Sequence, residues 1–291
     1  MTTRPCTVTV GSLHYDIVID APHRPVAGET VAGHRWYPKF GGKGGNQAVA
    51  AAAAGCVSRM VAATGDDDFG TFLRRKLKES GVDDRWVAEL TGEGSGMSVA
   101  ISDVTGDYGA VFVSGSNLGI AVGQLADPSV WEGAGVLVLQ NEIPESVNIA
   151  AAMEARARGL PVVLNAAPYR PMSDTFLDLV TILVVNAVEA EGMCGVAVSD
   201  PASAARAAQT LGKRFPCVVV TAGGDGVAVM EDGATRSIAA RPVKLISTHG
   251  AGDCFTGTLA ARLCFGDSLF EAAKAANQAA GEHVSRVRDT V

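Results

Sequence analysis

Ile182-Leu183-Val184-Val185-Asn186 is a run of four apolar residues that ends in a polar one. The same pattern occurs elsewhere in the chain, at Val136–Gln140, Val162–Asn165 and Cys217–Thr221. Short continuous apolar runs are typical of strands in a parallel sheet that helices cover on both faces. Alanine-rich segments at 147–158 and 202–211 lie between these runs and favour the covering helices. The sequence therefore predicts an α/β fold, a three-layer sandwich around a mostly parallel sheet.

The polar residues that end these runs point to a binding site. They are Gln140, Asn165, Asn186 and Thr221. Ligands of such sheets bind beyond the carboxyl ends of the strands. We therefore expect the four side chains to converge on one crevice.

Two segments interrupt the alternation of strands and helices. Residues 17–40 and 97–117 read as alternating strands with turn signals, Asp20-Ala21-Pro22 and Thr105-Gly106-Asp107, and without a helix between them. We interpret them as a small antiparallel sheet, a β lid that projects from a single domain over residues 1–291. An ordinary pair of edge hairpins is the alternative.

A glycine-rich turn, Thr248-His249-Gly250-Ala251-Gly252-Asp253-Cys254-Phe255-Thr256-Gly257, runs into an apolar helical pattern. Such a turn leaves the N–H groups of Ala251, Gly252 and Asp253 unpaired at the positive end of a helix dipole. Glycines at 250 and 252 let a phosphate approach the backbone. This predicts phosphoryl transfer, in which the amides stabilise the transferred group and Asp253 accepts the proton of the attacking hydroxyl. A turn that serves only as a tight connection is the alternative.

A second glycine-rich segment, Phe40-Gly41-Gly42-Lys43-Gly44-Gly45-Asn46-Gln47, precedes an alanine-rich helical run that stops at Gly55. Four glycines in five positions make a backbone that can wrap a small polar ligand, and Lys43 and Asn46 can hydrogen-bond that ligand. The segment lacks the spacing of a Walker A loop. Its ligand therefore need not be a phosphate.

With both motifs in this order, the chain resembles the PfkB family of carbohydrate kinases and, within it, the ribokinase-like branch. Residues 41–48 and 250–255 are similar to the family's N-terminal and C-terminal motifs, and Asn186-Ala187-Val188-Glu189 is similar to its N-x-x-E element. Gly11–Asp16 lies where the family has its first strand and sugar-binding carboxylate. The resemblance implies an ATP-dependent kinase that phosphorylates a primary hydroxyl of ribose or a related sugar, with the lid over the sugar.

The motifs and the resemblance together assign the candidate residues. The catalytic set is the base Asp253 with the turn of Gly250, Ala251 and Gly252. The substrate-binding set is His14, Asp16, Gly42, Lys43, Asn46 and Glu142. The nucleotide-binding set is Asn186, Thr221, Gly223, Gly224, Gly226 and Asn277. Glu189 is expected to order Mg²⁺ through water. Structural roles are the alternatives for Asp16, Glu142, Glu189 and Asn277: a turn aspartate, a helix N-terminal acid, a first-turn glutamate and a solvated asparagine.

Two positions depart from the family pattern. Ser247 stands where the ribokinase branch usually has an aspartate that helps to bind an activating monovalent cation, and Arg286 and Arg288 would repel that ion. Activation by K⁺ is therefore doubtful. His14 replaces a usual asparagine and reads a different hydroxyl pattern, stacks on a base, or is satisfied by backbone. One alternative function is a nucleoside kinase, which a His14 facing an aromatic base would favour. The other is a catalytically silent sugar-binding protein on the same fold.

Composition limits the partners. A net charge of −7 over 291 residues argues against nucleic acid. The chain has neither an apolar run of about twenty residues nor the apolar core of a secretion signal. We therefore expect a cytoplasmic protein that does not bind a membrane. The six cysteines form no C-x-x-C pair and predict reduced thiols. The expected partners are ATP and a sugar or nucleoside, together with a homodimer through the lid.

Overall fold

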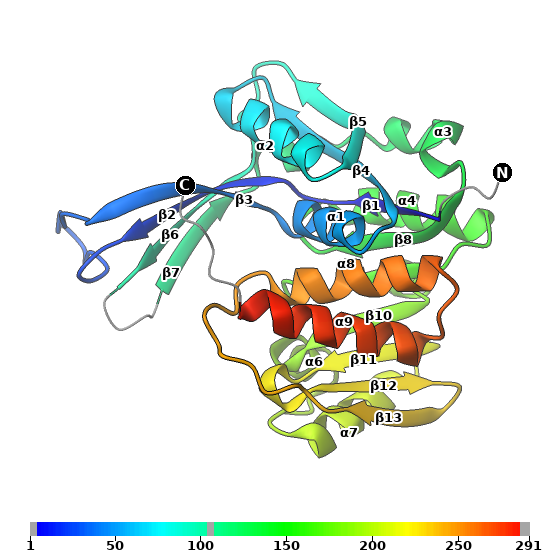
Figure 1. Ribbon diagram of the computed structural model, residues 1–291. Helices are drawn as coiled ribbons and strands as arrows, with labels where there is room; N and C mark the ends of the chain where they lie inside the picture. The colour runs from blue at the N-terminus through cyan, green and yellow to red at the C-terminus, as the bar shows by residue number, and fades with distance from the viewer. Residues whose placement is uncertain (1–4, 104–107, 286–291) are drawn as a thin grey trace.

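The computed structural model describes residues 5–103 and 108–285. Within these ranges the main sheet has nine strands in the order β13-β12-β11-β10-β9-β8-β1-β4-β5 (Figure 1). Their bounds are β1 Cys6–Val10, β4 Val57–Gly65, β5 Val82–Leu90, β8 Ala134–Gln140, β9 Val162–Asn165, β10 Ile182–Asn186, β11 Cys217–Thr221, β12 Val227–Glu231 and β13 Ala234–Ile238. The pairs from β11 to β5 are parallel, and β12 and β13 add an antiparallel edge. The predicted three-layer α/β fold is confirmed.

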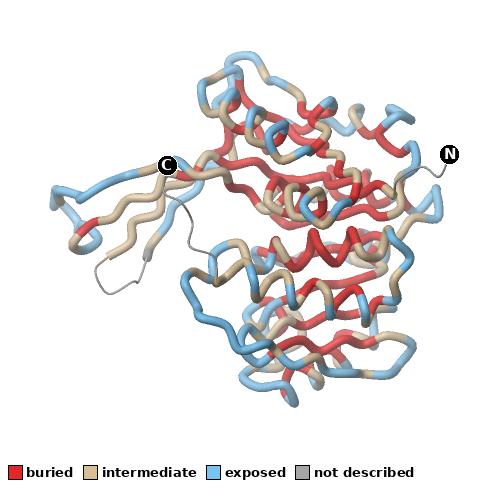
Figure 2. The backbone as a smooth tube through the Cα atoms, in the orientation of Figure 1, coloured by how far each residue is buried: buried red, intermediate tan, exposed pale blue. Residues whose placement is uncertain are grey.

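Helices cover both faces of this sheet. Their bounds are α1 Lys43–Ala53, α2 Asp68–Glu79, α3 Pro128–Trp131, α4 Glu145–Ala157, α5 Asp174–Leu177, α6 Ala187–Cys194, α7 Pro201–Leu211, α8 Ala251–Cys264 and α9 Leu269–Val284. In Figure 1, α1, α8 and α9 lie in a row in front of the sheet. Figure 2 shows that buried residues concentrate in the sheet and on the helix sides that face it.

The position of β8 in the sheet explains why its sequence is apolar up to Gln140. Because successive side chains of a strand point to opposite faces, Val136 and Val138 pack in the cluster that contains Phe255 of α8. Leu137 and Leu139 pack in the opposite cluster with α4 and α7. Both faces of β8 are therefore buried, as a parallel strand between two helix layers requires.

The lid is a separate sheet that projects from one end of the main sheet (Figure 1). Its strands, in the order β3-β2-β6-β7, are β2 His14–Asp20, β3 Arg35–Gly41, β6 Met97–Ser102 and β7 Tyr108–Val113. The outer pairs are antiparallel as expected, but the central β2–β6 pair is parallel. The reason is topological, because β2 follows β1 and β6 follows β5, and both preceding strands run in the same direction in the main sheet. The predicted turn at 105–107 lies outside the described residues.

None of the helices in the described ranges combines the length and the apolar character that crossing a membrane requires.

Candidate active site

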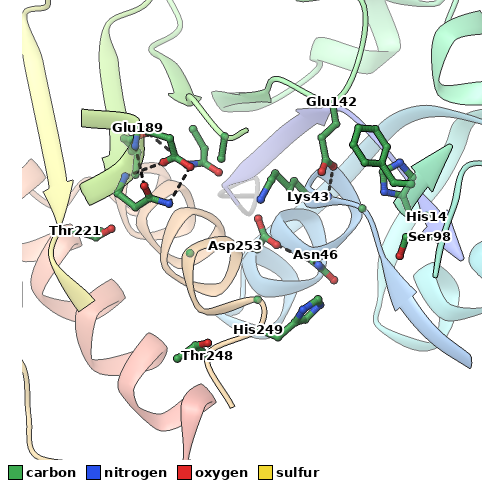
Figure 3. A pocket seen from close by; sticks show the side chains of 18 of the residues that line it. His14, Lys43, Asn46, Ser98, Glu142, Glu189, Thr221, Thr248, His249 and Asp253 are labelled. Atoms are coloured by element: carbon green, nitrogen blue, oxygen red, sulfur yellow. Dashed lines mark hydrogen bonds between the residues drawn. The ribbon is translucent and has the colours of Figure 1, made fainter. Parts of the chain in front are cut away.

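A cavity of about 430 Å³ lies where the carboxyl ends of β9, β10 and β11 meet the N-termini of α1 and α8 (Figure 3). Asn165, Asn186 and Thr221 line it, so three of the four predicted strand ends converge. Gln140 does not line it, and that part of the prediction is wrong. Its side chain is fully buried against Gly11, where an added Cβ would lie 1.9 Å from Gln140 Oε1. A glycine at 11 thus makes room for the glutamine inside the protein.

Asp253 lies in the first turn of α8, at the floor of this cavity. Its Oδ2 accepts a hydrogen bond from Asn46 Nδ2 at 3.1 Å. Burial raises the pKa of Asp253 to about 6, although the charge of Lys43 and the amide hydrogen bonds act in the opposite direction. A carboxylate with a pKa near neutrality suits a general base, because it is ionised at working pH and still accepts a proton readily.

Gln47 is the residue that the sequence interpretation missed. Its Nε2 donates to Asp253 Oδ1 at 3.0 Å and to Asn165 Oδ1 at 3.1 Å. The side chain is fully buried in α1. The available signal was a polar residue inside an alanine-rich run that otherwise faces the core. Asn46, expected to hold substrate, likewise contacts the carboxylate of Asp253.

Gly250 starts α8 in the left-handed conformation, with φ +78°. The N–H of Ala251 is not unpaired as predicted, because it donates to the Thr248 carbonyl at 3.2 Å. As first-turn residues, Gly252 and Asp253 have N–H groups for which the helix offers no partner. An added Cβ at Gly252 would meet no atom of the described residues within 4 Å. This glycine therefore keeps the entrance to the helix N-terminus open.

The N-terminal glycine motif packs against the chain itself. An added Cβ at Gly44 would lie 2.6 Å from Ser12 N, and one at Gly45 would lie 2.7 Å from side-chain atoms of Leu13 and Phe40. Neither glycine lines the cavity, so the prediction that they wrap a ligand is wrong, and they instead allow α1 to approach the loop after β1. Gly42, with φ +84°, does line the cavity.

Glu142 joins the start of α1 to the loop after β1. Its Oε2 accepts hydrogen bonds from Lys43 N at 2.8 Å and from Ser12 Oγ at 2.5 Å. The carboxylate therefore caps α1, which is a helix-terminal role, and it also lines the cavity.

The lid contributes polar side chains from the opposite side. Asp16 Oδ1 accepts a hydrogen bond from Ser98 Oγ at 2.5 Å, and burial raises the pKa of Asp16. His14 is 4% exposed, and its Nε2 has no hydrogen-bond partner among the described residues. Its ring lies 5.9 Å from that of Phe112. The cavity is lined by His14, Asp16, Ser98 and Phe112. Because Nε2 of His14 has no partner among the described residues, this atom is not satisfied by backbone.

Glu189 and Asn186 form a reciprocal cap at the start of α6. Asn186 N and Nδ2 each donate to the Glu189 carboxylate at 2.8 Å, and Glu189 N donates to Asn186 Oδ1 at 3.0 Å. Burial raises the pKa of Glu189, which the charge of Lys43 partly offsets. The N-x-x-E element is thus a capping box. Both residues also line the cavity, so the first-turn and functional interpretations of Glu189 are compatible.

A second cavity of about 440 Å³ adjoins the first and shares Thr221, Thr248 and Gly252 with it. The other predicted nucleotide residues that line it are Gly223, Gly224, Gly226 and Asn277. Asn277 Nδ2 donates to the Ala239 carbonyl at 3.0 Å and so holds the loop along the cavity. Apolar side chains such as Val243 and Phe255 complete the walls. This cavity suits a flat, partly apolar group joined to phosphates that reach Gly252.

Comparison with known proteins agrees with this geometry. The model of the pfkB family carbohydrate kinases matches residues 6–290. The chain belongs to this family. Within the pfkB family, it is 34% identical over 284 residues to the ribokinase of Haemophilus influenzae, covering 96% of this chain and 92% of that protein. It is 34% identical over 267 residues to the ribokinase of Mus musculus, covering 90% and 83%.

A solved structure is similar over nearly the whole chain. The structure of Arabidopsis thaliana ribokinase complexed with ribose and ATP has a TM-score of 0.89 and 28% identity, and the similarity covers 98% of this chain and 94% of that one. The pfkB fold thus accounts for both the main sheet and the lid.

Proposed function

We propose that this pfkB family enzyme is an ATP-dependent ribokinase, which transfers the γ-phosphoryl group of ATP to a primary hydroxyl of ribose. One observation carries the proposal: a buried carboxylate, Asp253, lies at the helix N-terminus where a polar cavity under the lid joins a second, more apolar cavity. The ribokinases among its relatives support ribose as the sugar. They do not favour the nucleoside kinase alternative.

In the proposed reaction the sugar lies under the lid. Asp16 and Glu142 accept hydrogen bonds from its hydroxyls, and His14 Nε2 faces another hydroxyl. Asp253 accepts the proton of the attacking hydroxyl, whose oxygen bonds to the γ-phosphorus of ATP. The bond between that phosphorus and the β–γ bridging oxygen breaks, and ADP leaves.

The protein stabilises the charge of the transferred group with fixed dipoles. The N–H groups of Gly252 and Asp253 lie at the positive end of α8, next to the junction of the two cavities. The charge of Lys43 acts on both Asp253 and Glu189, and all three residues line the same cavity. We therefore assign Lys43 to the phosphoryl group rather than to the sugar alone.

The residues present fit a Mg²⁺ ion that the nucleotide carries. The described residues contain no group of three or more His, Cys, Asp or Glu that could hold a metal by themselves. Mg²⁺ commonly keeps several waters and binds one or two carboxylates together with substrate phosphates. Glu189, with a buried carboxylate on the cavity wall, would hold the ion through water. When bound, the ion supplies positive charge to the phosphates.

We also propose a homodimer formed through the lid. One face of the lid exposes the apolar side chains of Trp36, Val111 and Val113, and the opposite face exposes Phe112. An exposed apolar surface of this kind on the first face is typical of a protein–protein contact. Sedimentation of the purified protein, compared with a Val111→Glu variant, tests the dimer.

The function is tested with a substrate screen. Purified enzyme, ATP and Mg²⁺ are incubated with ribose, deoxyribose, fructose and common nucleosides, and ADP release is measured. Asp253→Asn provides the background control. We expect the highest kcat/KM for ribose, with the product phosphorylated at its primary hydroxyl. A preference for a nucleoside would overturn the sugar assignment, and sugar binding without ADP release would favour the silent protein.

A further inference from the structure

The loop before α8 is fastened to the end of α9 by hydrogen bonds. Ile246 N and Ser247 N both donate to the Val284 carbonyl, at 2.8 and 3.2 Å. One residue earlier on α9, His283 Nε2 lies 3.1 Å from the carbonyl oxygen of His249. The active-site turn is therefore held by a helix that is distant from Asp253 in the sequence.

The contact fixes which nitrogen of His283 carries a proton. A carbonyl oxygen only accepts hydrogen bonds, so Nε2 must be the donor. The ring also lies against the next residue, because an added Cβ at Gly250 would be 3.3 Å from His283 Nε2. His283 lines neither cavity. It therefore acts on the turn and not on a ligand.

Gly250 needs such an external restraint. It is the N-cap residue of α8 with φ +78°, and glycine has the largest freedom to leave that conformation. The His249 carbonyl and the Gly250 N–H belong to one planar peptide unit. A hydrogen bond that fixes the carbonyl consequently fixes the peptide plane from which α8 starts, and with it the direction of the following N–H groups.

We propose that His283 is a positioning residue for phosphoryl transfer. Its Nε2–H holds the 249–250 peptide so that the N–H groups of Gly252 and Asp253 face the transferred phosphoryl group. The same helix carries Ala280, Gly281 and Val284 on the wall of the second cavity. A nucleotide in that cavity therefore lies against the element that orders the turn. The inference rests on the proposed phosphoryl transfer.

The test compares two substitutions of the same residue. His283→Ala removes the donor, whereas His283→Gln places an amide N–H near the position of Nε2. We expect His283→Ala to lower kcat by about 10- to 100-fold, as for misplaced catalytic groups, with the KM for ribose almost unchanged. His283→Gln should recover most of the wild-type kcat while having the same Tm as His283→Ala.

Gln278→Ala is the matched control on α9, because it removes an exposed hydrogen bond to Glu282 without touching the turn. It should behave as wild type. A His283→Ala enzyme with wild-type kcat, or a His283→Gln enzyme as slow as His283→Ala, would overturn the proposal.

A second readout separates this inference from the proposed function. Hydrogen exchange of the segment 248–256, measured without substrate, should be faster in His283→Ala than in wild type and in His283→Gln. If the wild-type protein does not phosphorylate ribose, the substrate assignment fails, while exchange still decides the role of His283. Equal exchange in all three proteins would contradict that role.

Discussion

Gln47 and Asp253 come from different ends of the sequence and meet through a hydrogen bond of 3.0 Å from Gln47 Nε2 to Asp253 Oδ1. Asn46, the preceding residue of α1, holds the other carboxylate oxygen. The N-terminal half of α1 therefore orients the proposed base, which lies on α8. Any change in the packing of these two helices should therefore alter the position of the Asp253 carboxylate.

Gln47→Leu should raise the pKa of Asp253, because the hydrogen bond from Gln47 is one of the contacts that lower it. The carboxylate also loses one of its restraints, so we expect kcat to fall by about tenfold. The pH dependence of kcat/KM measures both effects. An acid limb at the wild-type position would show that Gln47 does not act on the base, and Tm serves as the control for folding.

The wild-type pH profile tests the base itself. Asp253 must be ionised to accept a proton, and burial raises its pKa to about 6. We expect kcat/KM to fall about tenfold per pH unit below about pH 6 and to be level above it. An acid limb near pH 4, which is ordinary for an aspartate, would show that burial does not raise the pKa of Asp253 in the working enzyme.

Asp253→Asn should keep substrate binding and lose turnover, because an amide cannot accept the hydroxyl proton. Loss of a general base usually lowers the rate by about 10²–10⁴. The measurements are kcat at saturating ribose and ATP and the Kd of each ligand. More than about a tenth of the wild-type kcat would make the base assignment wrong.

The main sheet could be predicted from the sequence because its central strands are buried on both faces. The apolar runs at 162–165, 182–186 and 217–221 coincide with β9, β10 and β11. β13 was not identified, since an edge strand with exposed residues carries no apolar run. The parallel pairing of β2 and β6 in the lid could not be predicted either, because it depends on the directions of β1 and β5 in the main sheet and not on the local sequence pattern.

Each motif contributes residues that line the two cavities, but the partners of each side chain could be found only from the tertiary structure. Glycine spacing could not distinguish a ligand-binding backbone from one that packs on Ser12, as at Gly44. Similarly, a lone glutamine in a helix is usually solvated, and Gln47 acquires its role when α1 packs beside α8. The place of Asp253 at a helix N-terminus was predictable, because a glycine-rich turn runs there into an apolar helical pattern.

Gly252→Val should abolish turnover without unfolding the enzyme. No atom of the described residues lies within 4 Å of an added Cβ at Gly252, so the new side chain fits. It would occupy the space where the two cavities meet. A branched side chain there blocks the phosphoryl group from the N–H groups of α8. We expect loss of kcat with an unchanged Tm, and Gly252→Ala provides a smaller control. Normal activity in both variants would mean that the turn has only a structural role.

The remaining prediction concerns monovalent cations. Ser247 stands where the ribokinase branch usually has an aspartate, so a full negative charge is missing near such an ion. Arg286 and Arg288, which we also expect to repel it, lie outside the described residues. Ser247 Oγ accepts a hydrogen bond from His249 N at 3.3 Å instead, and His283 engages the His249 carbonyl.

The turn is thus ordered by hydrogen bonds within the protein, which need no bound ion. We expect kcat and KM to change little when K⁺ is replaced by a large organic cation at constant ionic strength. Ser247→Asp restores the charge and should create a dependence on K⁺, which makes it the matched variant. Several-fold activation of the wild-type enzyme by K⁺ would contradict the prediction, because backbone carbonyls near Ser247 and His249 would then suffice to bind the ion without a carboxylate.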